Sequence, residues 1–517
     1  MTAAPAFLAD DPRFAAMIEA LADGAPVERI DTHGAAVFLA GDRAYKIKRP
    51  VAFPYMDLST PARRLAAAEA EVRLNRRTAP ALYLGLAPVR DNGRSLSLGA
   101  VGDPVPDGGE CVVVMVRFDQ ATLFDRLAQA DGLTDGLVMG LAEEIAAFHA
   151  GAETIADRGG AAEMTWVAEE NLDELLARTD VLDPATLGRL AARTRAALGR
   201  LAPVMDARLA QGFVRHCHGD LHLRNVCLVE GHPTIFDALE FNDALAVTDT
   251  MYDLAYMLMD LVHRGLRPSA CLLLNRYLEM TEDDGGLALL PFFMSVRAAV
   301  RAKVSLSMAA VQHDAAASDG FVADARDYLA LAAGCLEPVR PVIAAVGGLS
   351  GSGKSTVARA LAPLLDPAPG AVVLRSDVIR KHLMGVDDLE TLGAEGYRPE
   401  VSAQVYDRLI ERSRAVAEAG FSAIADATFT REDGRAALAA AAAAAGVPFH
   451  GIWLDADRAT LVARVAARTG DPSDADAAVV ARQLDEDLGT IDWSRHDARQ
   501  PARDTAASIA ARIRGAT

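Results

Sequence analysis

The sequence predicts two folds in one chain: an α+β bilobal fold over residues 1–336 and an α/β fold with a doubly wound parallel sheet over residues 341–517. Prolines 338 and 341 interrupt helix formation and mark the boundary. Before it, short strand-like runs extend to about residue 120 and helical periodicity follows. After it, short apolar runs alternate with helical segments, which is typical of a parallel sheet covered on both faces. The apolar runs are 342–346, 371–374, 423–425 and 450–454.

Composition indicates a folded chain and excludes several classes of protein. The 517 residues are 51% hydrophobic and 24% charged, which excludes disorder throughout. The formal net charge of −19 argues against binding to nucleic acid or to anionic membranes, because both need dense lysine and arginine patches. The longest apolar stretches are too short to cross a bilayer, and residues 1–13 do not have the pattern of a secretory signal. The five cysteines are scattered without CxxC spacing, so we expect reduced thiols and a cytoplasmic protein.

The small N-terminal lobe contains lysines and glutamates in a strand and a helix. Residues 43–48 read as a strand that carries two lysines on one side, and residues 61–77 read as a helix. The two glutamates of this helix are two residues apart and point to different sides, so only one can face a lysine. These charged residues would lie on the surface by default. A catalytic-loop pattern further along the chain makes the lysines candidates for binding ATP phosphates and the glutamates candidates for holding the lysine. The candidates are Lys46 or Lys48 and Glu69 or Glu71, and we favour Lys46 with Glu71.

The segment His218–Asn225 matches the HxDxxxxN pattern of a phosphoryl-transfer catalytic loop. In that pattern Asp220 orients and deprotonates the acceptor hydroxyl, and Asn225 binds Mg²⁺. Asp237 follows a second short apolar run and would hold the Mg²⁺ ions that bridge the ATP phosphates. Two short strands can form a hairpin that gathers these side chains, and we expect His218 to brace the loop by hydrogen bonding. A transition-metal site is the alternative, because histidines and cysteines crowd positions 216, 217, 218, 222 and 227.

With these motifs, residues 30–330 resemble the aminoglycoside phosphotransferase and choline kinase-like superfamily. The resemblance rests on the catalytic loop, on Asp237 and on Asp253-Leu254-Ala255. It implies a kinase-like bilobal fold. The sequence departs from protein kinases at the loop that covers the nucleotide, because Thr32-His33-Gly34 offers a single glycine.

In the C-terminal part, Gly348–Thr356 fits GxxxxGK[ST], follows a strand-like run and leads into a helix. Glycines let backbone N–H groups turn toward phosphates, and the helix N-terminus adds positive potential. Lys354 would reach the outer phosphates and Ser355 would hold Mg²⁺. A glycine-rich turn without a ligand is the alternative, which the flanking strand and helix disfavour. The candidates for nucleotide binding are Gly348, Ser350, Gly351, Ser352, Gly353, Lys354, Ser355 and Thr356.

Three clusters after the P-loop favour a kinase over a motor ATPase or a switch. Asp377 ends the second strand, at the edge where doubly wound sheets bind ligands, so it would accept a proton from a substrate hydroxyl. Arg380 would hold an anionic group of the substrate, and Asp426 suits a Mg²⁺–water contact. Arg464 and Arg468 lie four apart on one helical face, where they can close over transferring phosphate. The alternatives are helix N-caps for the aspartates and a solvated face for the arginines.

Residues 342 to about 490 resemble the small P-loop kinases, which include gluconate kinase, chloramphenicol phosphotransferase, the zeta toxins and the kinase part of polynucleotide kinases. The resemblance implies Asp377 as the base and Arg464 and Arg468 as lid residues. Together the two halves resemble a bacterial protein described as an aminoglycoside phosphotransferase-like domain fused to a P-loop ATP-binding domain.

We therefore expect a bifunctional phosphotransferase that uses ATP and Mg²⁺ at two sites and transfers phosphate to hydroxyls of small molecules. One alternative is a single active kinase domain regulated by a nucleotide-sensing partner domain. Another is a polynucleotide kinase or a toxin-type kinase in the P-loop half. The net charge of −19 argues against the polynucleotide kinase, because it disfavours binding to nucleic acid. The sequence predicts no oligomeric state.

Overall fold

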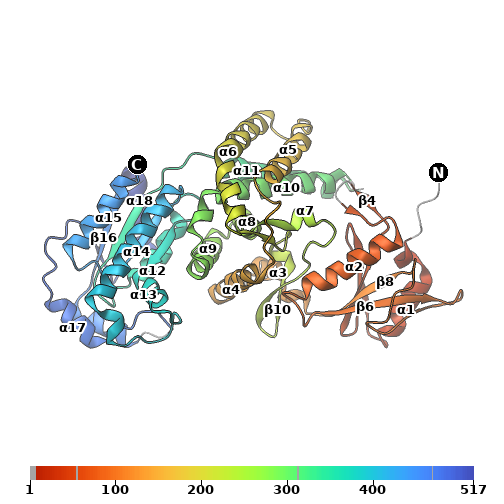
Figure 1. The fold of residues 1–517 in the computed structure, drawn as a ribbon, viewed down its shortest axis with the longest axis horizontal. Helices are drawn as coiled ribbons and strands as arrows, with labels where there is room; N and C mark the ends of the chain where they lie inside the picture. The colour runs from red at the N-terminus through yellow and green to blue at the C-terminus, as the bar shows by residue number, and fades with distance from the viewer. Residues whose placement is uncertain (1–6, 54–55, 311, 313, 468–469, 517) are drawn as a thin grey trace. The chain divides into compact units, whose positions relative to one another are not determined.

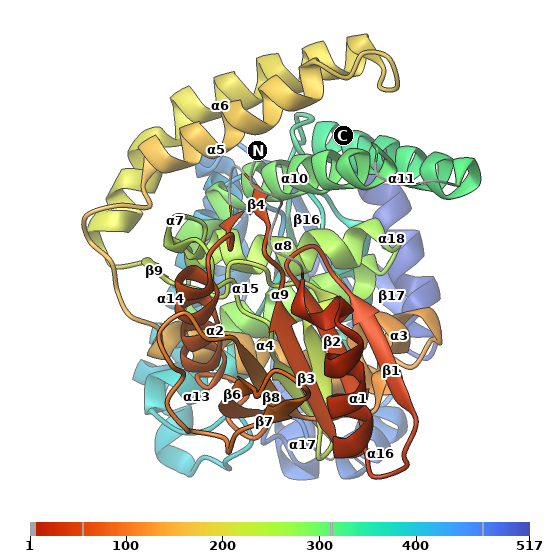
Figure 2. The same ribbon diagram turned by 90° about the vertical axis from the view of Figure 1, so that its right-hand side faces the viewer.

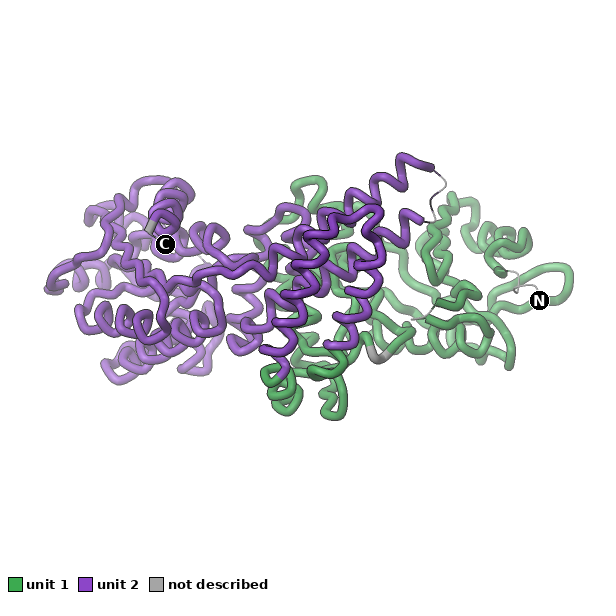
Figure 3. The backbone as a smooth tube through the Cα atoms, turned by 90° about the horizontal axis from the view of Figure 1, so that it is seen from above, with its two compact units in different colours: residues 1–164, 203–257 green, residues 165–202, 258–517 purple. Residues whose placement is uncertain are grey.

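The computed structural model describes residues 7–53, 56–310, 312, 314–467 and 470–516 (Figure 1). The chain divides into two compact units, each made of two segments (Figure 3). Unit 1 consists of Met1–Met164 and Pro203–Met257, and unit 2 consists of Thr165–Ala202 and Leu258–Thr517. No helix in the described parts of the chain is long and apolar enough to cross a membrane. The predicted domain boundary at 336–341 stays a prediction.

Unit 1 contains a six-stranded antiparallel sheet in the order β1-β2-β3-β8-β6-β7. Side chains alternate across this sheet, so its two faces bury different residues. Phe38 and Ile47 lie in one cluster with Phe14 of helix α1, whereas Leu39 and Val113 lie in another with helix α2. Figure 2 shows α1 beside β2. The strands are β1 (Val27–Asp31), β2 (Ala35–Ala40), β3 (Arg43–Lys48), β6 (Tyr83–Asp91), β7 (Leu96–Leu98) and β8 (Cys111–Val116), and the helices are η1 (Leu8–Asp10), α1 (Pro12–Leu21) and α2 (Pro61–Asn75).

The rest of unit 1 is helical with three short strand pairs. β4 pairs with β5, β9 pairs with β12, and β10 and β11 form the hairpin that the sequence predicts near Asp237. These strands are β4 (Ala52–Phe53), β5 (Met56–Asp57), β9 (Val214–His216), β10 (Val226–Val229), β11 (His232–Ile235) and β12 (Val247–Asp249). The helices are η2 (Gln120–Thr122), α3 (Phe124–Gln129), α4 (Asp135–Gly151), η3 (Leu223–Asn225), α7 (Asp243–Ala246) and the first part of α8 (Thr250–His263).

Unit 2 contains the predicted parallel sheet, with strands in the order β14-β15-β13-β16-β17. Helices α12 and α18 pack on one face and α14 and α15 on the other. The strands are β13 (Ile343–Gly347), β14 (Val372–Arg375), β15 (Ala423–Asp426), β16 (Phe449–Asp455) and β17 (Ser494–Asp497). The associated helices are α12 (Lys354–Leu361), η5 (Ala362–Leu364), α13 (Ser376–Met384), η6 (Ala394–Tyr397), α14 (Pro399–Glu418), α15 (Glu432–Ala444), α16 (Arg458–Ala466), α17 (Ala477–Asp485) and α18 (Ala502–Ala516).

Further helices of unit 2 come from earlier in the chain, and one of them covers the edge of this sheet. β14 is an edge strand, and the Asn275 side chain of α9 pairs with it. The N–H of Val373 donates to Asn275 Oδ1 at 2.7 Å, and Asn275 Nδ2 donates to the carbonyl of Ala371 at 3.1 Å. These helices are α5 (Ala161–Leu176) and α6 (Pro184–Ala210), both of which begin or end in unit 1, α9 (Arg267–Thr281), η4 (Asp284–Ala288), α10 (Leu290–Ala310) and α11 (Ala315–Cys335).

Candidate active sites

In unit 1, one buried glutamate holds two lysines of β3. Lys46 and Lys48 share a face of the strand with Ala44, which packs against α2. Glu71 of α2 is fully buried, with Oε1 at 2.7 Å from Lys46 Nζ and Oε2 at 2.5 Å from Lys48 Nζ. Glu69 is exposed. The structure thus places both candidate lysines on Glu71.

The charges of this cluster stabilise one another. Burial acts to raise the pKa of Glu71, but Lys46 and Lys48 outweigh it and lower the pKa to about 2. Burial acts to lower the pKa of Lys46, but Asp237 and Glu71 raise it well above its usual range. Lys48 also forms an ion pair with Glu240, whose pKa burial raises. Lysines and glutamate are therefore charged together near neutral pH.

Unit 1 is expected to lose stability as the pH falls from about 4.5 toward about 2, the ordinary and folded pKa values of Glu71. A carboxylate with a lowered pKa stabilises the fold above its unfolded pKa and ceases to do so as it becomes protonated. The measurement is hydrogen exchange of α2 between pH 5 and 2.5. Glu71→Gln cannot titrate, so it should lack this part of the pH dependence, and a pH dependence as large as that of wild type would contradict the assignment.

The catalytic loop folds so that Asn225 contacts Asp220. The 3-10 turn η3 returns the chain, and Asn225 Nδ2 donates to the carbonyl of Asp220 at 2.9 Å and to its Oδ2 at 3.1 Å. His222 Nε2 lies 3.4 Å from the same Oδ2. His218 braces the loop as expected, because its Nε2 lies 3.0 Å from the carbonyl of Phe236. The two predicted catalytic-loop side chains are therefore neighbours.

Asp253 fixes the backbone of this loop by accepting hydrogen bonds from it. Its carboxylate accepts the N–H of His218 at 3.0 Å and the N–H of Gly219 at 2.9 Å. Gly219 has a φ of +81°, and a Cβ there would lie 3.1 Å from Leu239. His149 Nε2 also lies 3.2 Å from Asp253. Asp253, the first residue of Asp253-Leu254-Ala255, thus holds the loop in its shape.

The transition-metal alternative finds little support in the geometry. Among the described residues, one group of three metal-capable side chains is close enough, and it joins His149, Cys217 and Asp253. Only Cys217 belongs to the five positions that suggested a metal. The Asp253 oxygens already accept hydrogen bonds from the loop, which favours a structural role.

Asp237 stands beside the lysine cluster. Its Oδ1 lies 2.6 Å from Lys46 Nζ, and its side chain is partly exposed. Its φ is +61°, and its N–H donates to the hydroxyl of Tyr83 at 3.3 Å. The next N–H, of Ala238, donates to Asn75 Oδ1 at 2.8 Å. The structure therefore brings Lys46, Glu71 and Asp237 together, while Thr32-His33-Gly34 forms only the short connection from β1 to β2.

In unit 2 the glycines of the P-loop are required by its path. Gly348 has a φ of +141° and Gly351 a φ of +85°. Added Cβ atoms would lie 2.7 Å from the carbonyl oxygen of Leu454 and 2.5 Å from that of Leu461. Gly353, with a φ of +84°, precedes Lys354 at the start of α12. The loop thus delivers its backbone to a helix N-terminus, as a phosphate cradle needs.

Protein groups contact the P-loop in this structure. Lys354 Nζ donates to the carbonyl of Leu349 at 3.2 Å. The N–H of Ser350 donates to Oε1 of Gln483, from α17, at 2.8 Å. The Arg464 guanidinium donates to the carbonyls of Ser352 at 3.4 Å and Ala498 at 2.8 Å, and its role as a lid residue stays a prediction. Arg468 lies outside the described residues.

A buried arginine contacts both unit 2 residues that the sequence assigns to Mg²⁺, Ser355 and Asp426, and also Asp471. Arg375 Nη2 donates to Ser355 Oγ at 3.3 Å and to Asp471 Oδ2 at 3.0 Å, and its Nε lies 3.5 Å from Asp426 Oδ2. Burial acts to lower the Arg375 pKa, but Asp426, Asp471 and Asp377 raise it. These hydroxyl and carboxylate oxygens surround a positive charge, so they fit Mg²⁺.

The segment that follows Asp377 contacts Asp474, which lies between α16 and α17. Arg380 is buried and donates to the carbonyl of Gly396 at 2.7 Å and to Ser402 Oγ at 3.3 Å, so its guanidinium is used on protein groups here. Asp474 accepts from Tyr397 Oη at 2.7 Å and from buried Lys381 at 3.0 Å. Asp377 lies in the first turn of α13.

Several residues of these sites escaped sequence reasoning. Their partners lie far away in the chain, so no local spacing indicates them. Glu240 alone had a local signal, since it lies three residues after Asp237 in the same segment without regular secondary structure. The missed residues are Asn75, Tyr83, Glu240, Arg375, Lys381, Asp471, Asp474 and Gln483.

Comparisons with known proteins match two separate stretches of the chain to two different family models. Residues 57–290 match the family model described as the phosphotransferase enzyme family, and residues 343–486 match one described as an AAA domain. An uncharacterized protein of Mycobacterium tuberculosis is 33% identical over 478 residues, which cover 89% of this chain and 90% of the relative. The chain belongs to the family of this mycobacterial protein. A relative from Mycobacterium bovis has the same identity and coverage.

Two solved structures are similar to portions of this chain. A gluconokinase from Sinorhizobium meliloti is 23% identical, and the match covers 34% of this chain and 95% of that one, with a TM-score of 0.24. A choline/ethanolamine kinase family protein from Mesorhizobium loti is 16% identical and covers 63% and 96%, with a TM-score of 0.36.

The family matches confirm the predicted resemblance and both fold classes. This member of the family has a kinase-like phosphotransferase domain and a P-loop domain with a parallel sheet. It is a phosphotransferase enzyme of the kinase type.

Proposed function

We propose that the protein uses ATP and Mg²⁺ at two separate sites and phosphorylates hydroxyl groups of small molecules at each. The observation that carries the proposal is that each unit holds its own set: Lys46 between Glu71 and Asp237 in unit 1, and Ser355 with Asp426 beside the P-loop in unit 2. The net charge of −19 supports small-molecule acceptors over nucleic acid. The division of the two activities would fall at residues 336–341.

In unit 1, Lys46 would bind the phosphates of ATP while Glu71 holds its ammonium group in place. Asn225 and Asp237 would hold Mg²⁺, because their amide and carboxylate oxygens are the ligands that Mg²⁺ prefers. Bound Mg·ATP would supply the phosphoryl group, and its Mg²⁺ would offset the negative charge of that group. Asp220 takes the proton of the acceptor hydroxyl as that oxygen bonds to the γ-phosphorus and the bond to the β-phosphate breaks.

In unit 2, backbone N–H groups of the P-loop and Lys354 would bind the phosphates, and Ser355 and Asp426 would hold Mg²⁺. Asp377 would accept the proton of the second acceptor hydroxyl. Gln483 releases the N–H of Ser350 when a phosphate takes its place. Arg464, together with Arg468, would offset charge on the transferred group.

The test incubates wild type, Asp220→Asn and Lys354→Ala with ATP, Mg²⁺ and a bacterial metabolite extract, and identifies new phosphorylated species by mass spectrometry. Two products are expected, one lost in each variant, and each variant serves as the folding control for the other site. Loss of one shared product in both variants would contradict two independent kinases and favour a nucleotide-sensing partner domain.

A further inference from the structure

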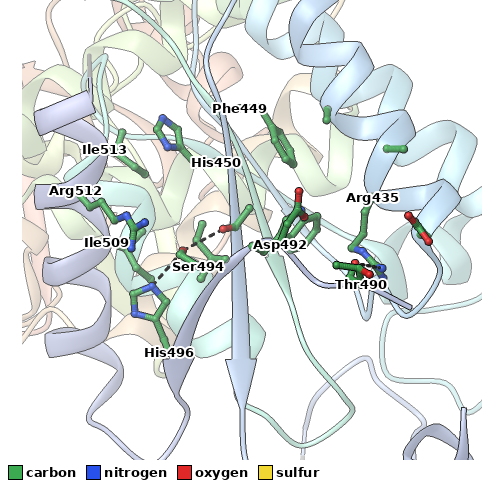
Figure 4. A pocket seen from close by; sticks show the side chains of 16 residues that line it. Arg435, Phe449, His450, Thr490, Asp492, Ser494, His496, Ile509, Arg512 and Ile513 are labelled. Atoms are coloured by element: carbon green, nitrogen blue, oxygen red, sulfur yellow. Dashed lines mark hydrogen bonds between the residues drawn. The ribbon is translucent and has the colours of Figure 1, made fainter. Parts of the chain in front are cut away.

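A cavity of about 490 Å³ lies in unit 2 beside β16, β17, α15 and α18 (Figure 4). It is lined by Phe449, His450 and Gly451 from the start of β16. The P-loop follows the end of β13, which runs parallel to β16. Since the two strands run in the same direction, the cavity lies at the end of the sheet where the strands begin, and the P-loop lies at the end where they finish. The cavity is therefore separate from the proposed nucleotide site.

The cavity exists because β17 is short. It begins to pair with β16 only at Ser494 and Ile452, so residues 449–451 pair with β13 on one side and have no strand partner on the other among the described residues. Trp493 packs directly against Gly451, where any Cβ would collide with the indole ring. The open edge of β16 is thus partly filled by an aromatic ring and partly left as a cavity.

Among the described residues that line the cavity, those on the α18 side include basic side chains and no acidic one. Ile452 packs with Ile509 of α18, so His450, two residues earlier on the strand, faces α18 as well. Ser494 and His496 are in register with Ile452 and Leu454 and share that face. Figure 4 shows Arg512 reaching from α18 to between the rings of His450 and His496.

The acidic lining residues lie elsewhere. Figure 4 shows Asp492 and Arg435 on the other side of β17 from Arg512. Glu432 and Arg435 come from α15, and the Arg435 guanidinium donates to the carbonyls of Phe429, Thr430, Leu488 and Thr490. Both terminal nitrogens of Arg435 thus donate to backbone carbonyls of the protein.

Two groups on the α18 side have unused hydrogen-bonding capacity. Arg512 is exposed and forms no hydrogen bond or ion pair with any described residue. His450 Nε2 is buried without a hydrogen-bond partner within the described chain. His496 Nε2 lies 3.3 Å from Ser494 Oγ, whose hydroxyl donates to the carbonyl of Gly451 at 3.0 Å. An arginine fork beside two imidazoles offers donors from several directions, as a tetrahedral oxyanion requires.

We propose that this cavity binds a small phosphorylated molecule, with its phosphate at Arg512 between His450 and His496. The isoleucines at 452, 509 and 513 form an apolar wall for the rest of the molecule. The volume falls within the range of small-molecule sites. The site is additional to both proposed kinase centres and does not depend on their activity.

Binding at this position is coupled to proton uptake. Burial and then the charge of Arg512 lower the pKa of both His450 and His496. An anion beside Arg512 offsets its charge and favours protonated imidazoles. Arg435, Glu432 and Asp492 are the other charged groups that line the cavity, on the far side of β17. Affinity for an anion of fixed charge is therefore expected to be higher at pH 6 than at pH 8.

The experiment measures sulfate binding by isothermal titration calorimetry, because sulfate keeps the same charge between pH 6 and 8. All proteins carry Lys354→Ala, which weakens anion binding at the P-loop. Arg512→Ala is expected to weaken sulfate binding about tenfold, which corresponds to about 1.4 kcal/mol. Arg503→Ala, an exposed arginine on the same helix outside the cavity, should leave the affinity unchanged.

A second readout separates loss of the site from loss of the fold. The imidazole C2–H signals of His450 and His496, assigned with His450→Gln and His496→Gln, should titrate at higher pH when sulfate is present. Arg512→Lys should restore part of the affinity. Equal affinity in Arg512→Ala and Arg503→Ala, or histidine titrations that sulfate does not move, would overturn the proposal.

Discussion

Asp220→Asn is expected to lower the turnover number of the N-terminal site by about 10²–10⁴. The substitution keeps the size of the side chain but removes the oxygen that takes the acceptor proton. Asn225 Nδ2 also bonds to the carbonyl of Asp220, at 2.9 Å, so this part of the loop is retained. Nucleotide affinity should therefore change little while turnover falls.

Steady-state kinetics on the product of the N-terminal site, with nucleotide titration of the same variant, checks this split. Asp157→Asn is the matched control, because Asp157 is an exposed aspartate in unit 1. A variant that retains turnover would show that Asp220 is not the base. Loss of nucleotide binding in Asp220→Asn would instead assign Asp220 to the nucleotide site.

Glu71→Ala is expected to destabilise unit 1 by about 3–5 kcal/mol, the usual effect of removing one partner from a buried ion pair. Glu71 is fully buried, and its loss leaves the ammonium groups of Lys46 and Lys48 close together with less negative charge to offset them. Asp237 and Glu240 remain as partners, so the unit should still fold at low temperature.

Glu69→Ala is the matched control for this second variant, since Glu69 lies on the same helix but is exposed. Urea unfolding gives the free energy, and hydrogen exchange of α2 and β3 assigns the change to unit 1. The Michaelis constant for ATP at the N-terminal site should rise in Glu71→Ala only. Equal stability of the two variants would contradict the buried cluster.

Local patterns were sufficient to predict the parts of the sites that are contiguous in sequence. The catalytic loop and the P-loop each combine a fixed spacing with a flanking strand or turn, so they could be predicted together with both fold classes. The strand period also placed Lys46 and Lys48 on one side of β3. It could not show that Glu71 contacts both lysines, because that depends on how α2 packs against the sheet.

The features that sequence reasoning missed arise from tertiary packing or from weak hydrophobic signals. β17 consists of Ser494, Arg495, His496 and Asp497, a polar run whose strand conformation comes from pairing with β16 alone. Arg375 lies two residues before the predicted base Asp377. Its contacts with Ser355 and Asp471 form only when segments that are distant in sequence pack together. Neither a strand pattern nor a motif indicates such contacts.

The pairing of Asn275 with β14 bears on how the protein is made. An uncovered edge strand is a template for aggregation with another chain. Chains emerge from the ribosome N-terminus first, and α9 precedes β14 in the sequence, so the covering helix is synthesised before the edge that needs it. Helix α9 is therefore already synthesised when β14 emerges, and Asn275 can take the place of a neighbouring strand at that edge.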